Sequence, residues 1–191
     1  MKYALAVFGV IIVAVLAIVL ITRKPSDSTQ TPNGTSRKVD LMQMNGDGTE
    51  MVFTSFGRLV AEEQRRGIRI SVSQDERKVE VLTGYESVVS SSQIFPNTAT
   101  SYDNFLAAVK RAGFIAARKT DIIDERGVCP TGSRFNYNVL DYGEEVVHLW
   151  GTSCAKGQGT FAGNASLIAR LFQSQIPGYN KIAADVRRTQ K

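Results

Sequence analysis

Residues 68–81 read IRISVSQDERKVEV, and this stretch decides the fold class. Apolar side chains occupy every second position from Ile68 to Val72. After the polar run QDER, the same alternation resumes from Lys78 to Val81. Alternation with a period of two places successive side chains on opposite faces of a strand. The stretch therefore predicts an antiparallel β-hairpin with one face buried.

The segments on either side of this hairpin are less regular. Gly84 predicts a β-bulge before a further extended run at residues 85–95, which Pro96 ends. Residues 51–64 leave two interpretations open, a helix face or an edge strand. Residues 114–117 predict a short strand. The hairpin thus belongs to a larger set of strands.

Three later segments show the periodicity of helices. The first begins with a cap at Thr100 or Ser101 and ends at Gly113. The second begins at Asn164, Pro177 breaks it, and the third follows. Locally paired strands with helices on one side predict an α+β domain, an antiparallel β-sheet with about three helices packed on it. The apolar stripe of the first helix consists of Tyr102, Phe105, Leu106, Val109 and Ala112.

A second hairpin is predicted between the two cysteines, Cys129 and Cys154. Strand-like runs at 134–140 and 145–152 flank a three-residue turn, in which Gly143 suits the left-handed position. Facing residues then have numbers that sum to about 284, and the two cysteine numbers sum to almost the same value. A disulfide across the open end would close a loop of about 25 residues and contribute roughly 3 kcal/mol. Two unrelated buried thiols or a lone nucleophile are the alternatives.

An apolar run without a polar side chain extends from Ala4 to Ile21. As a helix rising about 1.5 Å per residue, it can cross a hydrocarbon core of about 30 Å. The run is longer than the apolar region of a signal peptide and lacks an A-x-A cleavage site. We therefore favour an uncleaved signal anchor over a cleaved signal peptide. Both flanks are basic, so charge does not decide the orientation. A disulfide needs an oxidising compartment, which predicts a cell-membrane protein with its C-terminal domain outside the cytoplasm.

The sequence thus predicts three parts. These are a transmembrane signal anchor at residues 1–24, a flexible linker at 25–50 and an extracytoplasmic α+β domain at 51–191. Residues 25–38 lack any large apolar side chain, so they cannot bury enough surface to offset the entropy of ordering. We expect membrane lipid to contact residues 3–22. The apolar run has no G-x-x-x-G pattern, which favours a monomer.

The positive charge of the chain is weak evidence for a nucleic-acid partner. The chain has 23 basic and 18 acidic residues. Lys2, Arg23 and Lys24 flank the apolar run, which leaves 20 basic against 18 acidic residues for the rest. We expect no nucleic acid, and instead a protein or an anionic envelope polymer. With a single histidine, the sequence predicts no metal site and no cofactor.

One face of the cysteine hairpin collects polar and aromatic side chains. In the predicted register, Phe135 and Tyr137 share the core face with Val147 and Leu149. Donors and acceptors beside an indole are typical of interaction surfaces. An ordinary half-exposed sheet face is the alternative, and it is the commoner outcome. The candidate recognition face consists of Arg134, Asn136, Asn138, His148 and Trp150.

The sequence predicts no catalytic residue. The serines at 90–92 lack the G-x-S-x-G pattern of a nucleophile elbow. The glycine-rich loop at 157–163 lacks the lysine of a phosphate-binding loop, so a simple connection is favoured. Glu62-Glu63 and Glu144-Glu145 are adjacent in sequence, so on a strand each pair points to opposite faces. These carboxylates are typical of solvated charges rather than of an acid–base pair.

Four motifs together carry a resemblance that covers roughly residues 55–186. They are CPTGSRF at 129–135, LWGTSC at 149–154, GTFAGN at 159–164 and QIPGY at 175–179. The chain resembles uncharacterised single-pass membrane-anchored proteins of small-genome candidate-phylum (Saccharibacteria-like) bacteria. The resemblance implies a location in the bacterial envelope and no known activity.

These features favour a membrane-tethered extracytoplasmic domain that binds a protein or a cell-envelope partner without catalysis. The scarcity of histidine and the lack of a nucleophile motif support this hypothesis. One alternative is an envelope hydrolase with a non-standard active site. Another is an accessory subunit of a secretion or surface-appendage machine.

Overall fold

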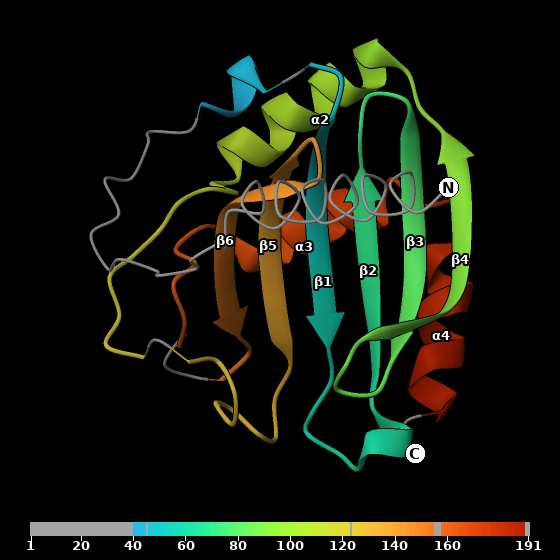
Figure 1. The fold of residues 1–191 in the computed structure, drawn as a ribbon, viewed down its shortest axis with the longest axis vertical. Coiled ribbons are helices and arrows are strands. Elements are labelled where there is room, and N and C mark those ends of the chain that lie inside the picture. The colour runs from blue at the N-terminus through green and yellow to red at the C-terminus, as the bar shows by residue number, and fades with distance from the viewer. Residues whose placement is uncertain (1–39, 45, 123, 155–157, 190–191) are drawn as a thin grey trace, which may run out of the picture. The chain divides into compact units, whose positions relative to one another are not determined.

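Six antiparallel strands form a single sheet in the order β4-β3-β2-β1-β5-β6 (Figure 1). The computed structural model describes residues 40–44, 46–122, 124–154 and 158–189. Strand β1 lies in the interior of the sheet, because it pairs with β2 on one side and with β5 on the other. The strands are β1 Thr49–Phe56, β2 Arg66–Val72, β3 Glu76–Thr83, β4 Val88–Pro96, β5 Arg134–Asp141 and β6 Glu144–Thr152.

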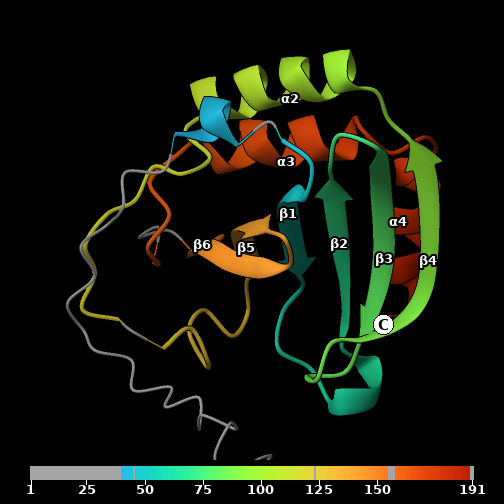
Figure 2. The same cartoon turned by 45° about the horizontal axis from the view of Figure 1, so that its top comes forward.

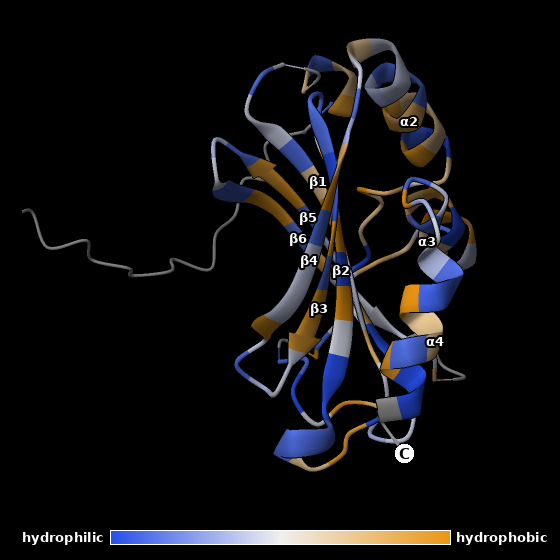
Figure 3. Cartoon of the chain, turned by 90° about the vertical axis from the view of Figure 1, so that its right-hand side faces the viewer, coloured by the Kyte–Doolittle hydropathy of each residue, from blue (hydrophilic) through white to orange (hydrophobic). Residues whose placement is uncertain are grey.

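Three α-helices cover one face of this sheet. With the sheet seen edge-on, α2, α3 and α4 all lie on the same side (Figure 3). Figure 2 shows α2 and α3 side by side, with α4 behind β3 and β4. This arrangement confirms the predicted α+β class. The helices are α2 Ala99–Arg111, α3 Ala165–Gln173 and α4 Tyr179–Thr189, with short 3-10 helices η1 Leu41–Gln43 and η2 Glu62–Gln64.

The predicted transmembrane segment, residues 1–24, lies outside the described residues. Within the described ranges, no helix combines the length and apolar character that crossing a bilayer requires.

Aromatic rings join the helical layer to the sheet. The Phe172 ring of α3 lies 5.5 Å from Phe53 of β1, 5.0 Å from Phe105 of α2 and 5.5 Å from Phe114, measured between ring centroids. Tyr137 of β5 continues the cluster at 5.6 Å from Phe53. Rings at these separations gain favourable edge-to-face and offset contacts in addition to their burial. This cluster is the centre of the hydrophobic core.

The predicted helix stripe is confirmed, and its start lies slightly earlier than expected. All five residues of the stripe are buried. The N-cap is Thr98, whose hydroxyl accepts a hydrogen bond from the Ser101 N–H at 3.2 Å. The predicted cap at Asn164 is also correct, because its side chain accepts from the Leu167 N–H at 3.0 Å. Both caps satisfy amide groups that a helix leaves unpaired at its first turn.

The folded domain begins before residue 51, which corrects the predicted linker of 25–50. Leu41 is fully buried in the core, and β1 already begins at Thr49. Asp40 caps η1 and pairs with Lys110 of α2, with 2.8 Å between Nζ and Oδ1. The hydrogen bond from Lys110 lowers the pKa of Asp40. The burial of one apolar side chain therefore holds this segment against the domain.

Residues 51–64 form neither a helix face nor an edge strand in their first half, since β1 is an interior strand. Gly84 is part of the turn between β3 and β4, with a φ of 72°. The strand irregularity lies before it in the sequence, between Val81 and Leu82. Only one isolated bridge, Ala117 to Phe161, forms in the strand predicted at 114–117. Each of these corrections depends on pairing that a local pattern does not reveal.

The cysteine hairpin forms with a tighter turn than predicted. Two residues, Tyr142 and Gly143, join the strands, and their φ angles of 48° and 82° are both positive. Turns of this kind match the twist of hairpin strands. Tyr137 faces Leu149, two residues from the partner that the predicted register implies, with an irregularity next to Val139. Because the shift is two residues, the side chains between the open end and this irregularity keep their predicted faces. Beyond it, Glu145 lines the groove together with His148.

The predicted disulfide closes the open end of this hairpin. Cys129 and Cys154 are bonded, with Cα atoms 5.9 Å apart. Two hydrogen bonds tie the same end together. The Ser133 N–H donates to the Ser153 hydroxyl at 2.8 Å, and the Ser153 N–H donates to the Ser133 carbonyl at 2.9 Å. The bond therefore reinforces a contact that the strands already make.

Two buried tyrosines give a matched pair of stability tests. The Tyr102 hydroxyl donates to the Thr49 carbonyl at 3.2 Å, whereas the buried Tyr137 hydroxyl has no hydrogen-bond partner among the described residues. We expect Tyr102→Phe to lower the free energy of unfolding by about 1 kcal/mol, and Tyr137→Phe to raise it by about the same amount. Urea denaturation at pH 7 measures both changes. A loss of stability in Tyr137→Phe would contradict the expectation.

The same tyrosines predict sensitivity to alkaline pH. Burial raises the pKa of Tyr137 and of Tyr102. A raised pKa in the folded state means that the stabilising effect is present below the unfolded pKa of about 10 and is lost as the pH rises beyond it. We therefore expect the urea midpoint to fall above about pH 10, and to fall less steeply in Tyr137→Phe. An equal slope in the variant would exclude Tyr137 as a source.

Candidate functional site

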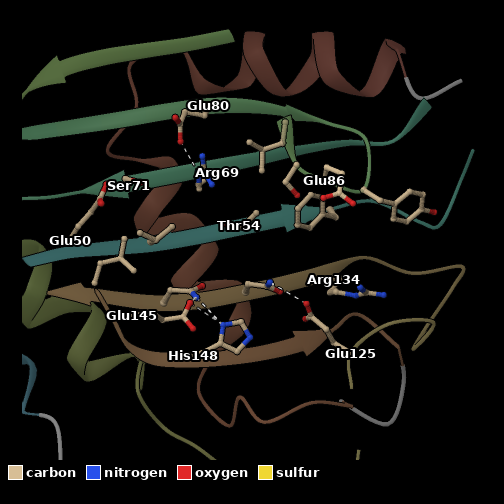
Figure 4. A pocket seen from close by; sticks show the side chains of 18 of the residues that line it. Glu50, Thr54, Arg69, Ser71, Glu80, Glu86, Glu125, Arg134, Glu145 and His148 are labelled. Carbon is tan, nitrogen blue, oxygen red and sulfur yellow. Dashed lines mark hydrogen bonds and ion pairs between the residues drawn. The ribbon is translucent and has the colours of Figure 1, made fainter. Parts of the chain in front are cut away.

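The helix-free face of the sheet contains a groove with a volume of about 740 Å³. Side chains from β1, β2, β3, β5 and β6 line it, because each strand directs alternate residues away from the helices (Figure 4). Strand β1 is the link between the two hairpins, since it pairs with both β2 and β5. The sheet therefore joins two polar faces that are far apart in the sequence.

Four of the five predicted recognition residues line this groove. Arg134, Asn136 and Asn138 do so from β5, and His148 does so from β6. Trp150 does not line it and is only 3% exposed, which corrects the prediction that this indole lies on an accessible face. The segment that contains Thr160 and Phe161 runs along β6 at Trp150. The Trp150 N–H donates to the Thr160 hydroxyl at 3.0 Å, and the Phe161 N–H donates to the Trp150 carbonyl at 2.9 Å.

Half of the groove comes from strands that the sequence analysis did not connect with the cysteine hairpin. Arg69 of β2 and Glu80 of β3 form an ion pair, with 2.6 Å between Nε and Oε2. Lys78 of β3 and Glu50 of β1 are 3.9 Å apart. The alternation in residues 68–81 already identified most of these charges as the polar face of a hairpin. The sequence does not reveal β1 as the strand between the two hairpins. Val52 and other apolar residues on its groove face obscure the alternation of polar and apolar side chains.

The single histidine belongs to a hydrogen-bonded cluster at the β6 side of the groove. His148 Nδ1 lies 2.9 Å from Asn138 Nδ2 and 3.3 Å from Glu145 Oε2. Asn138 also donates to Glu145. Farther along β5, Asn136 and Glu125 are hydrogen-bonded, which ties a loop to the groove. The cluster thus presents an arrangement of donors and acceptors that neighbouring residues hold in place.

A buried arginine occupies the other side of the groove. The Arg65 guanidinium lies between the Phe56 and Tyr85 rings, 4.4 Å from each ring centroid. The Tyr85 ring is fixed in turn, because its hydroxyl donates to the Val60 carbonyl at 2.8 Å. Burial lowers the pKa of Arg65, and the charge of Arg134 lowers it further. Contact with two aromatic faces stabilises a cation that water reaches poorly. We call Arg65, Phe56 and Tyr85 the arginine clamp.

Sequence reasoning missed the arginine clamp entirely. Gly67 explains part of its geometry, because a Cβ atom at this position would lie 2.5 Å from the Phe56 ring. Phe56 and Gly67 are cross-strand partners, so the ring lies over the glycine. A glycine that follows two arginines in the sequence does not by itself indicate that an aromatic ring lies over it. Only the strand register reveals that Gly67 leaves space for the Phe56 ring.

Within the described ranges, no group of three or more His, Cys, Asp or Glu side chains is arranged to hold a metal ion.

Searches against protein-family models, curated proteins and solved structures find no match to the chain. The resemblance to uncharacterised envelope proteins therefore stays a prediction.

Proposed function

We propose that the chain is a membrane-tethered extracytoplasmic domain that binds a polar partner in the groove, without catalysis. The observation that carries this proposal is the groove itself, a concave polar surface on the helix-free face of the sheet. Cations and carboxylates both line it. Such a lining suits a partner that carries hydrogen-bond donors and acceptors, or groups of both charges. A protein segment or an envelope polymer has this chemistry.

The burial of its charges distinguishes the groove from an ordinary sheet face. The Glu80 side chain is only 12% exposed, although it carries a charge, and Arg65 is 5% exposed. Charged groups seldom lie so deep unless they are paired or bind something. Fixed, partly desolvated groups also lose less entropy on binding than mobile surface side chains. These features support binding.

The state of the carboxylates favours binding over hydrolysis. Glu80 pairs with Arg69, and Glu50 lies beside Lys78. Glu145 accepts a hydrogen bond from Asn138, and its Oε2 lies 3.3 Å from His148 Nδ1. A general acid or base needs a carboxylate that reaches the substrate with a suitable protonation state. Carboxylates held by neighbouring cations and amides are better suited to positioning a partner.

The disulfide supports the proposed compartment. A bond between Cys129 and Cys154 persists in an oxidising space, such as the outside of a bacterial cell membrane. The apolar run at residues 4–21 has the length of a membrane anchor. Together they support a domain held near the membrane on its outer side.

Site-specific photo-crosslinking in native membranes tests the proposal. A benzophenone amino acid replaces Asn138 in the groove or, as a matched control, the exposed Asn104 on α2. Benzophenone inserts into C–H bonds, so it captures a protein or a polysaccharide partner. We expect an adduct of defined mass from Asn138 and none from Asn104. Adducts from neither position, or equally from both, would contradict binding in the groove.

A further inference from the structure

Arg65 is a buried cation that lines the groove. It is 5% exposed, and the two rings of the arginine clamp cover both faces of its guanidinium. Its Nε is inaccessible and has no hydrogen-bond partner. Within the described part of the chain, Arg65 makes no ion pair. The nearby Glu62 raises the pKa of Arg65, but it is the weakest of the influences on that pKa. The Glu62 carboxylate instead accepts a hydrogen bond from the Tyr85 N–H at 3.0 Å. Tyr85 raises the pKa of Arg65 more strongly than Glu62 does, in part through a hydrogen bond, and Arg65 lines the groove.

Arg134 lines the same groove from β5. Its cross-strand partner in β1 is Phe56, so both side chains point into the groove. The Nε of Arg134 is also buried without a partner. Arg65 thus contacts the Phe56 ring, and Arg134 is the cross-strand neighbour of Phe56 in the same groove. Neither arginine makes an ion pair within the described residues.

This arrangement is costly without a bound anion. Two like charges repel each other, and partial burial removes water that would otherwise stabilise them. The fold nevertheless fixes Arg65 in place, because Gly67 leaves room for the Phe56 ring that covers it. A planar guanidinium with covered faces offers two N–H groups at its edge. That geometry matches the two oxygens of a carboxylate or phosphate group.

We propose that Arg65 and Arg134 form an oxyanion-binding subsite at one end of the groove. The inference rests on the proposed function of the groove and names the chemistry of one part of it. The ligand is a carboxylate or phosphate group carried by the partner. Glu86 and Glu125 lie near this end (Figure 4), so they restrict the subsite to a single anionic group.

Nuclear magnetic resonance of the arginine side chains tests the subsite. The full chain in detergent micelles is titrated with sodium acetate and, separately, with sodium phosphate, at an ionic strength held constant with sodium chloride. The Nε–Hε signal of Arg65 is identified by its absence from Arg65→Lys. We expect a saturable shift of this signal with at least one of the two anions. A response to acetate alone indicates a carboxylate-bearing partner, and a response to phosphate alone indicates a phosphate-bearing one.

Conservative variants provide the controls. Lysine keeps the charge but loses the planar donor pair, so Arg65→Lys and Arg134→Lys should each weaken anion binding about tenfold. Arg111→Lys, at an exposed position on α2, should leave it unchanged. If Arg65→Lys does not fold, the Nε–Hε signal of Arg134, identified by its absence from Arg134→Lys, is titrated in the wild-type chain instead and keeps the test decisive.

Two results would overturn the subsite. One is the lack of a saturable shift with either anion, and the other is unchanged affinity in the folded lysine variants. The subsite can also fail separately from the proposed function. Crosslinking from Asn138 without any anion response would leave the groove as a binding site and remove the oxyanion chemistry. An anion response without crosslinking from Asn138 would keep the oxyanion chemistry and contradict the binding of a protein or polysaccharide partner in the groove.

Discussion

Replacing Phe172 with alanine is expected to lower the free energy of unfolding by about 3–5 kcal/mol. Phe172 is fully buried, and its ring contacts rings from β1, α2 and the segment after α2. Removing the ring leaves a cavity between the sheet and both helices, which well-packed neighbours fill only in part. A loss of this size is a large part of the stability of a domain of this length.

Urea denaturation of the full chain in micelles measures this change. The single tryptophan, Trp150, is buried and lies outside the Phe172 cluster, so its fluorescence reports on the whole domain. Phe172→Leu is the control, and it should cost only about 1 kcal/mol because most of the volume is kept. Equal small losses in both variants would show that Phe172 does not link the two layers.

Loss of the disulfide is expected to have the second largest effect, about 3 kcal/mol. The bond between Cys129 and Cys154 spans a sequence separation of 25 residues, so it removes many conformations from the unfolded chain. Replacing both cysteines with serine should therefore lower the urea midpoint. Wild-type protein treated with reductant should lose the same amount. Unchanged stability after reduction would contradict the effect.

Thiol labelling in intact cells connects this prediction with the proposed compartment. A maleimide that does not cross membranes should label neither cysteine before reduction. It should label both after treatment with a reductant that stays outside the cell. Labelling without reduction would mean that the disulfide does not form in the cell. Protection even after external reduction would mean that the domain faces the cytoplasm.

The polar face of the cysteine hairpin was predictable because it depends on parity alone. Alternation assigned Arg134, Asn136, Asn138 and His148 to one face, and a register error of two residues did not change that assignment. The burial of Trp150 was not predictable in the same way. It lies where a segment some ten residues farther along the chain folds back on β6.

The arginine clamp and the groove illustrate what a local pattern does not contain. Phe56, Arg65 and Tyr85 are separated in sequence and meet only through the pairing of β1, β2 and β3. The alternation in β1 is weak because Val52 and Phe56 lie on the polar face. An interior strand with apolar residues on both faces resembles other buried segments.

The sequence by itself determined the fold class, the hairpins, the helix stripes and the cysteine pairing. These features follow from periodicity, caps and turn residues, which act over a few neighbouring positions. The tertiary structure alone decided that β1 joins the two hairpins, that Trp150 is covered and that Arg65 and Arg134 line one groove. Those features depend on strand register and packing between distant segments, where the favourable energy comes from contacts that no single stretch of the chain contains.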